Sequence, residues 1–162
     1  MLGLTLSDWK VALQEIYRIL APGGWINLLE ILFDASQWRW KTGPATTKLF
    51  KLVQAIFLGK GLVSDIPLLL LALLEEAGFV NIRIEEHAAR MYSEDGAVTR
   101  DIFHKVLVGI KKPVMDAGGM GFVKSEEEYD ALTNATIKEW LETPAAAVHM
   151  FIVYAQKPPS GS

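Results

Sequence analysis

A short stretch after the first apolar segment holds the residues best suited to bind a small molecule. Asp34, Trp38, Arg39 and Trp40 supply two flat apolar surfaces and charges of both signs. Pockets for small ligands combine apolar walls with a few polar groups, and in open α/β sheets they lie beyond the carboxyl ends of the strands. These four residues are therefore predicted to bind a substrate. The alternative is that Trp38 and Trp40 pack beneath the following helix, a common role of tryptophan.

Two titratable residues inside apolar segments are candidates for catalysis. Glu30 lies within residues 25–33 and His149 within residues 147–155. A buried carboxylate needs a partner or acquires a raised pKa, which would suit Glu30 to act as a base, and histidine is a frequent base. The alternatives are the more common roles: Glu30 lies at the solvent end of its strand or is hydrogen-bonded to a cap, and His149 is a hydrogen-bonded residue of the core. The catalytic residue therefore stays unknown at this level.

The composition excludes several other kinds of chemistry. The chain has no cysteine, so disulfides, thiolate nucleophiles and cysteine-ligated zinc are excluded. His87, His104 and His149 lie too far apart in sequence to form a local metal motif. The glycine-rich residues 118–121 follow a helical segment rather than a strand, so they indicate a turn and not a phosphate loop. No metal-binding or cofactor-binding residue is predicted.

Length, charge and hydropathy are those of a soluble globular chain. Its 162 residues are 51% hydrophobic and 22% charged, which suffices for a substantial core. With a net charge of −3 and no basic stripe, the chain is not expected to bind nucleic acid. The most apolar run, residues 66–74, is shorter than the roughly 20 residues that span a membrane. No basic leader precedes the first helix, so an intracellular location, cytoplasmic or nuclear, is expected.

Periodicity and turn residues predict five helices and three strands in an α/β order. Helices are expected from Ser7 or Asp8 to Leu20, over 44–58, through the leucine-rich run to Gly78, over 98–115, and after a Ser125 cap. Residues 25–33 and 147–155 are almost continuously apolar, which is typical of strands buried on both faces, whereas 80–85 alternates and is placed at a sheet edge. One α/β domain over residues 1–157, with a tail at 158–162, is predicted.

Three strands make an incomplete sheet. The last strand can lie between the first strand and the alternating one, which leaves one edge of residues 25–33 unpaired. An apolar edge of this kind favours pairing with another chain. We therefore expect a homodimer, or a partner chain, along the edge of residues 25–33, which would complete the sheet.

Three segments resemble class I S-adenosylmethionine-dependent methyltransferases. The segment IYRILAPGGW (16–25) resembles the helix-to-strand junction of that family. The segment LLEEAGFVNI (73–82) resembles the approach to its penultimate strand, and HMFIVYAQKP (149–158) resembles its closing strand. Together with Trp25 and the late histidine and Lys-Pro pair, they are most similar to fungal secondary-metabolism methyltransferases of the LaeA type. The segments occur in the family's order and span nearly the whole chain.

The resemblance implies a Rossmann-like sheet with strand order 3-2-1-4-5-7-6, of which this chain supplies the last three strands, the closing strand being antiparallel. It implies transfer of a methyl group from S-adenosylmethionine to a small apolar secondary metabolite. The family's first strand, its glycine-rich cofactor loop and its ribose-binding acidic residue would lie before Met1. The chain would thus be the C-terminal half without its own cofactor-binding residues, and residues 34–40 would face the methyl acceptor.

Three functions are compatible with these residues. The first is methyl transfer, with S-adenosylmethionine as a cofactor by resemblance only. The second is a truncated, non-catalytic relative that binds a partner through the edge of residues 25–33. The third is a binder or cyclase of small apolar molecules without any cofactor, in which a pocket lined by Trp38, Trp40, Phe50 and Phe57 acts through shape and desolvation.

Overall fold

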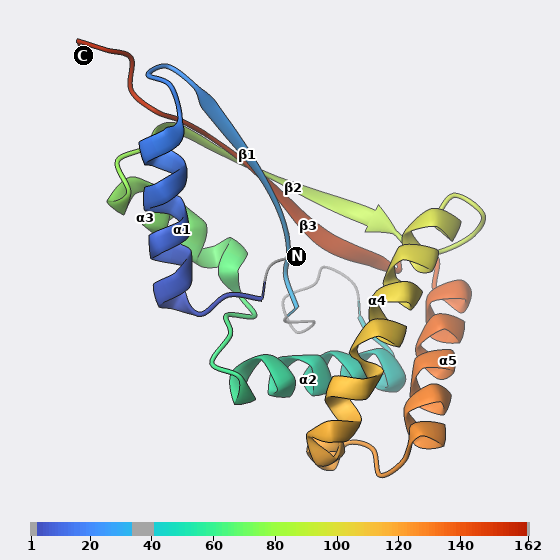
Figure 1. The fold of residues 1–162 in the computed structure, drawn as a ribbon. Coiled ribbons are helices and arrows are strands. Elements are labelled where there is room, and N and C mark those ends of the chain that lie inside the picture. Colours follow the sequence, from blue (N-terminus) through green and yellow to red (C-terminus); the bar gives the residue numbers. More distant parts are fainter. Residues whose placement is uncertain (1–2, 34–40, 162) are drawn as a thin grey trace. The chain divides into compact units, whose positions relative to one another are not determined.

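The computed structural model describes residues 3–33 and 41–161, and its elements follow the predicted order (Figure 1). The helices are α1 (Leu6–Ile19), α2 (Pro44–Gly59), α3 (Ile66–Glu76), α4 (Ala97–Asp116) and α5 (Glu126–Glu142), with a short 3-10 helix, η2 (Gly118–Gly121). The strands are β1 (Trp25–Ile31), β2 (Val80–Arg90) and β3 (Ala147–Gln156). The predicted alternation of helices and strands is confirmed over the described ranges.

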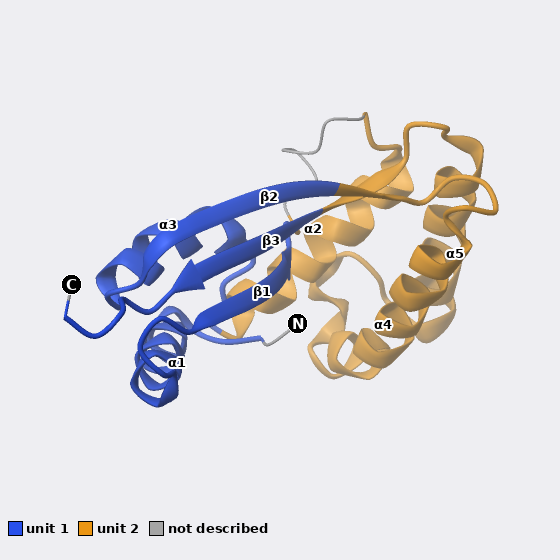
Figure 2. Cartoon of the chain, turned by 90° about the horizontal axis from the view of Figure 1, so that it is seen from above, with its two compact units in different colours: residues 1–32, 61–87, 150–162 blue, residues 33–60, 88–149 orange. Residues whose placement is uncertain are grey.

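The chain divides into two units, shown in different colours in Figure 2. Unit 1 comprises residues 1–32, 61–87 and 150–162, and unit 2 comprises residues 33–60 and 88–149. β2 and β3 each begin in one unit and end in the other. A single domain over residues 1–157 stays a prediction.

The three strands form one antiparallel sheet in the order β1-β3-β2. The pairing register of β1 with β3 sets Trp25 opposite Gln156 and Ile31 opposite Met150. Within the described residues β1 pairs with β3 alone, so its other edge carries no strand. The predicted central position of the last strand, and the predicted edge positions of the other two, are thereby confirmed.

The prediction that residues 25–33 are buried on both faces is wrong for β1. Ile26 and Leu28 pack toward the helices of unit 1, whereas Trp25 and Leu29 are each 53% exposed. Successive side chains of a strand point to opposite faces, and α1 and α3 cover one face of the sheet (Figure 1). The apolar residues on the other face therefore remain accessible in this unit.

The core of unit 1 lies between the sheet and helices α1 and α3. It joins Trp9 and Leu13 of α1 to Leu70 and Leu74 of α3 and to Val153 of β3. The chain turns out of α3 at Gly78, as predicted. Gly78 adopts a φ of 93°, which turns the chain so that Phe79 packs into the core. Its ring meets Tyr17 edge-on at 5.2 Å between centroids.

The first helix begins one turn earlier than its predicted cap. Thr5 is the N-cap, with its hydroxyl accepting from the Asp8 backbone N–H and the Asp8 carboxylate accepting from the Thr5 N–H, each at 3.2 Å. This reciprocal capping box satisfies two free backbone donors. Asp8, predicted as a cap, thus contributes as the third helical residue.

Lys157, in the Lys-Pro pair of the closing segment, caps the other end of α1. Its ammonium donates to the backbone carbonyls of Tyr17 and Leu20, both at 2.8 Å, and lies 4.8 Å from the Tyr17 ring centroid. A cation bonded to the last carbonyls of a helix is stabilised by the helix dipole as well as by the hydrogen bonds. The residue therefore has a structural role in unit 1.

Replacing Lys157 with methionine is expected to lower the free energy of unfolding by about 1.5 kcal/mol, because two carbonyls lose a charged donor. The matched control is Lys10→Met, which removes an exposed ion pair with Glu76 and should cost less than about 0.5 kcal/mol. Denaturant unfolding of both variants measures the difference. Equal effects of the two substitutions would contradict the capping role.

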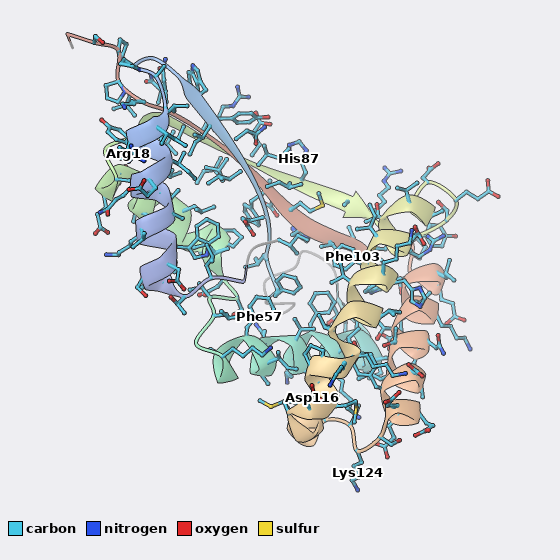
Figure 3. All side chains as sticks on the ribbon, in the orientation of Figure 1. Arg18, Phe57, His87, Phe103, Asp116 and Lys124 are labelled. Atoms are coloured by element: carbon cyan, nitrogen blue, oxygen red, sulfur yellow. The ribbon has the colours of Figure 1, made fainter. Side chains whose placement is uncertain are left out.

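In unit 2, α5 packs against its neighbours through one face. Tyr129, Leu132, Thr136 and Trp140 are all buried, and Trp140 meets Phe103 of α4 at 6.0 Å in an edge-on contact (Figure 3 labels Phe103). The Ser125 hydroxyl accepts from the Glu128 backbone N–H at 3.3 Å, which confirms the predicted cap. The Glu128 carboxylate reaches the Lys124 N–H instead of completing the box on Ser125.

Candidate functional site

The four residues predicted to bind a substrate, Asp34, Trp38, Arg39 and Trp40, lie outside the described residues. Their role stays a prediction. The structure describes the two ends of this segment: Phe33, which follows β1, and the start of α2 at Pro44. Phe33 and Pro44 both belong to unit 2.

Three phenylalanines gather at the first of these ends. Phe33 lies 6.0 Å from Phe50 and 5.4 Å from Phe57 between ring centroids. Phe33 and Phe50 are buried, whereas Phe57, which projects from α2 in Figure 3, is half-buried. Of the two phenylalanines predicted to line an apolar pocket, Phe50 thus belongs to the core and Phe57 keeps accessible surface.

A carboxylate from α5 anchors the second end. α2 begins at Pro44 with Gly43 as N-cap, which has no side chain to bond the free backbone donors. The Glu139 carboxylate accepts from the N–H groups of Ala45 and Thr46, each at 2.8 Å, and from the Thr46 hydroxyl at 2.7 Å. A negative charge is favoured at a helix N-terminus. Glu139 therefore caps α2 from a distant part of the chain.

Sequence reasoning missed Glu139. An acidic residue on the helix after Ser125 has no sequence signal that links it to residue 45, which lies 94 positions earlier. The sequence signal lies instead at the start of α2. Because Gly43 and Pro44 begin this helix without a capping side chain, its free N–H groups need an acceptor from elsewhere in the fold.

Glu30 is buried, so its alternative placement at the solvent end of β1 is wrong. It is 7% exposed and stands opposite Phe151 of β3. No hydrogen bond or ion pair to its carboxylate is seen among residues 3–33 and 41–161. Burial raises the pKa of Glu30 above its ordinary value of 4.5. The catalytic role of Glu30 stays a prediction.

The raised pKa of Glu30 predicts how stability depends on pH. Between 4.5 and the raised value the folded chain binds more protons than the unfolded chain, so Glu30 makes stability fall as pH rises through this window. Glu30→Gln should flatten that fall and raise the free energy of unfolding at pH 7 by about 1 kcal/mol. Urea unfolding at several pH values measures both effects. A variant less stable than the parent at pH 7 would contradict them.

His149 lies in unit 2, whereas Glu30 lies in unit 1. The imidazole is 2% exposed and is engaged with a neighbouring group, as expected of a core histidine. The two candidate bases therefore belong to different units. His87, in contrast, is exposed beside Glu85, with 3.3 Å between its Nε2 and the carboxylate.

The described residues do not fit a nucleotide-type cofactor. Such sites use a glycine-rich turn between a strand and a helix, where the backbone approaches the ligand closely. Where a described strand leads into a helix without a gap, from β2 to α4, the turn has one glycine, Gly96. A Cβ there would lie 2.6 Å from the Met91 carbonyl carbon and 2.9 Å from the Arg100 guanidinium. Gly96 is therefore explained by close packing of the chain on itself.

Searches of the described part of the chain found neither a metal site nor a membrane helix. No group of three or more histidine, aspartate or glutamate residues there could hold a metal ion. None of the helices in residues 3–33 and 41–161 is both long enough and apolar enough to cross a bilayer.

Comparison with known proteins places these observations in context. No family model matches the chain. Over 150 residues, 90% of its length, it is 31% identical to methyltransferase psoC of Aspergillus fumigatus. The chain is similar to part of a methyltransferase. It spans 52% of that relative, so it covers about half the length of the curated protein it matches.

A solved structure gives a weaker match. The phosphoethanolamine N-methyltransferase 2 of Haemonchus contortus, in complex with phosphomonomethylethanolamine and S-adenosylhomocysteine, aligns with a TM-score of 0.40 and 17% identity. The alignment covers 94% of this chain and 30% of that one. The similarity to methyltransferases that the three sequence segments predicted is thus confirmed by the fungal relative, whereas the LaeA type stays a prediction.

Proposed function

We propose that this chain acts in the S-adenosylmethionine-dependent methylation of a small apolar secondary metabolite and supplies the acceptor side of the site. The observation that carries the proposal is the 31% identity to a fungal methyltransferase over 150 residues. Residues 34–40 and the accessible Phe57 would form apolar walls for the acceptor. In this proposal the described residues take no part in binding the methyl donor.

Positioning is the contribution expected of such an acceptor side. Methyl transfer needs its two reactants in line, and little acid–base help beyond removal of the acceptor's proton. In this proposal Glu139 fixes the start of α2, the helix that carries Phe57. Glu30 and His149 stay the candidate bases, each within its own unit, and burial raises the pKa of the Glu30 carboxyl, which makes its carboxylate more basic than an exposed one.

We also propose that the free edge of β1 pairs with a second copy of the chain. Its sequence WINLLEI carries a single charge, and flat apolar edges of this kind are usually covered. Sedimentation should then show a dimer, and hydrogen exchange should show protected amides on both edges of β1. A monomer whose outward-facing β1 amides exchange rapidly would contradict pairing through this edge.

Ligand titration tests the proposed function. A planar apolar polyketide-like compound should quench tryptophan fluorescence of the full chain, whereas S-adenosylmethionine should give no calorimetric signal. Trp38→Phe and Trp40→Phe should each weaken binding of the apolar compound about tenfold, because each removes part of an aromatic wall. Trp25→Phe is the control, since Trp25 lies exposed on the sheet of unit 1.

The outcomes separate the alternatives. Tight binding of S-adenosylmethionine by the chain alone would overturn the division into donor and acceptor sides. Binding of neither compound would overturn the acceptor role and leave a partner-binding module. Conversion of the apolar compound in the absence of any donor would favour a cofactor-free cyclase instead.

A further inference from the structure

One face of the sheet in unit 1 carries none of the helices described for that unit. Successive strand residues point to opposite faces, and Ile26 of β1 and Val153 of β3 pack toward α1 and α3 (Figure 1). Their sequence neighbours Trp25 and Tyr154 therefore point to the opposite face. Because α1 and α3 are the helices in the described part of unit 1, this second face stays open within the unit.

A hollow of about 330 Å³, the sheet hollow, lies on the open face. Its lining comes from all three strands: Trp25 from β1, Tyr154 from β3, and Asn81, Arg83 and Glu85 from β2. Trp25 is 53% exposed and Tyr154 is half-buried, so both rings keep accessible surface. An exposed tryptophan beside a tyrosine is typical of a surface that another molecule covers, because both side chains combine apolar area with a hydrogen-bonding atom.

The charges that line the sheet hollow balance each other. The Arg83 Nη2 lies 2.7 Å from one carboxylate oxygen of Glu85, and the His87 Nε2 lies 3.3 Å from the other. Both acceptor oxygens of Glu85 therefore have a partner on β2 itself. An acidic ligand would be repelled by the Glu85 carboxylate and a basic ligand by the Arg83 guanidinium, so the sheet hollow favours a neutral ligand.

The polar groups that remain for a ligand are mostly hydrogen-bond donors. Arg83 contacts Glu85 through Nη2, and the other guanidinium nitrogens also carry N–H groups. Asn81 uses one N–H group of its amide to donate to Gln156 Oε1 at 2.7 Å, which leaves the second N–H group. The indole of Trp25 can only donate. The matching ligand is therefore apolar, rich in carbonyl oxygens and poor in donors of its own.

A proline-rich segment in the polyproline II conformation has these properties. Proline has no backbone N–H, and the carbonyls of this helix make no internal hydrogen bond. Because the conformation is already formed in the free peptide, binding orders little of the chain, which matters on a shallow surface. Trp25 and Arg83 lie on the two outer strands, roughly 10 Å apart at two strand spacings. One turn of a polyproline II helix rises about 9 Å and thus spans this width.

We propose that the sheet hollow binds a proline-rich segment of a partner protein in the polyproline II conformation. A proline ring lies between the side chains of Trp25 and Tyr154, and carbonyl oxygens of the segment accept from Asn81 and Arg83. Pairing of two chains through β1 uses backbone groups and leaves this face open. The proposal rests on unit 1 alone and does not depend on methyl transfer.

Nuclear magnetic resonance titration of the full ¹⁵N-labelled chain tests the proposal. The probe is hexaproline in the millimolar range, and the control is a glycine–serine peptide of equal length, which is neutral but flexible. Hexaproline should shift the amide signals of residues 25, 81–85 and 154, and the indole signal of Trp25, in a saturable way. The glycine–serine peptide should not. Equal shifts with both peptides, or no saturable shift with hexaproline, would overturn the assignment.

Two variants on the same strand sharpen the test. Trp25→Ala should weaken hexaproline binding about tenfold or more, because it removes one aromatic wall. Leu29→Ala is the matched control, since Leu29 lies on the same face of β1, is also 53% exposed and does not line the sheet hollow. It should leave hexaproline binding unchanged. Both side chains are exposed, so both variants should fold, and unaltered affinity in Trp25→Ala would exclude the sheet hollow as the binding site.

Discussion

Replacing Glu139 with alanine is expected to lower the free energy of unfolding of unit 2 by about 3 kcal/mol. Three hydrogen bonds to a charged acceptor disappear, and the N–H groups of Ala45 and Thr46 at the start of α2 lose their partner. Hydrogen exchange of the α2 amides and denaturant unfolding both measure the effect. Glu142→Ala is the matched control, because Glu142 ends the same helix in an exposed pair 3.8 Å from Lys138 and should cost less than about 0.5 kcal/mol.

Gly43→Ala provides an independent test of the same contact. A Cβ at Gly43 would lie 2.5 Å from the Glu139 carboxylate oxygens, so the carboxylate would have to leave its three donors. The substitution should therefore destabilise the parent by about 2 kcal/mol, yet cost little in the Glu139→Ala background. Additive effects of the two substitutions would show that they act through different contacts.

Leu13→Ala is expected to destabilise unit 1 by about 3 kcal/mol. Leu13 is fully buried between α1 and α3, and truncation leaves a cavity that the surrounding side chains fill only in part. Val11→Ala, on the exposed side of the same helix at 59% exposure, should change stability by less than about 0.5 kcal/mol. Unfolding followed by circular dichroism compares them. A small loss for Leu13→Ala would mean that α1 is not held by this core.

Local sequence signals predicted those features of the fold that depend on a single short-range interaction. Ser125 followed by Glu128, and Gly78 followed by Phe79, fix the ends of α5 and α3 through short-range hydrogen bonds and backbone conformation. The order of the strands also followed from the residue pattern, since the alternation of residues 80–85 predicts an edge strand and places the last strand between them and residues 25–33. The helix ends depend on residues within one turn of each other, and the strand order depends on how apolar residues are distributed along each strand.

The buried face of a helix or strand was not predictable where it depends on which other element packs against it. α4 carries two apolar stripes, and the structure buries Phe103 and Leu107 while Ile102 and Val106 are 54% and 37% exposed. Both stripes satisfy the helical period, so periodicity cannot choose between them. For the same reason β1 looked buried on both faces although helices cover only one.

The candidate site was predictable only in part. The titratable residues in apolar strands, Glu30 and His149, are both buried, as their surroundings in the sequence indicated. The cap from Glu139 arises from packing between helices far apart in sequence, and no residue pattern marks it.

The central position of β3 has a consequence for synthesis of the chain. β1 is translated about 120 residues before the strand it pairs with, and β2 about 60 residues before it. At roughly 5–20 residues per second, β1 waits on the order of 10 s outside the ribosome with both edges unpaired. During this interval the nascent chain exposes an apolar segment that cannot yet form a sheet. Chaperone capture of residues 25–31 would then govern how much of the protein reaches its folded state.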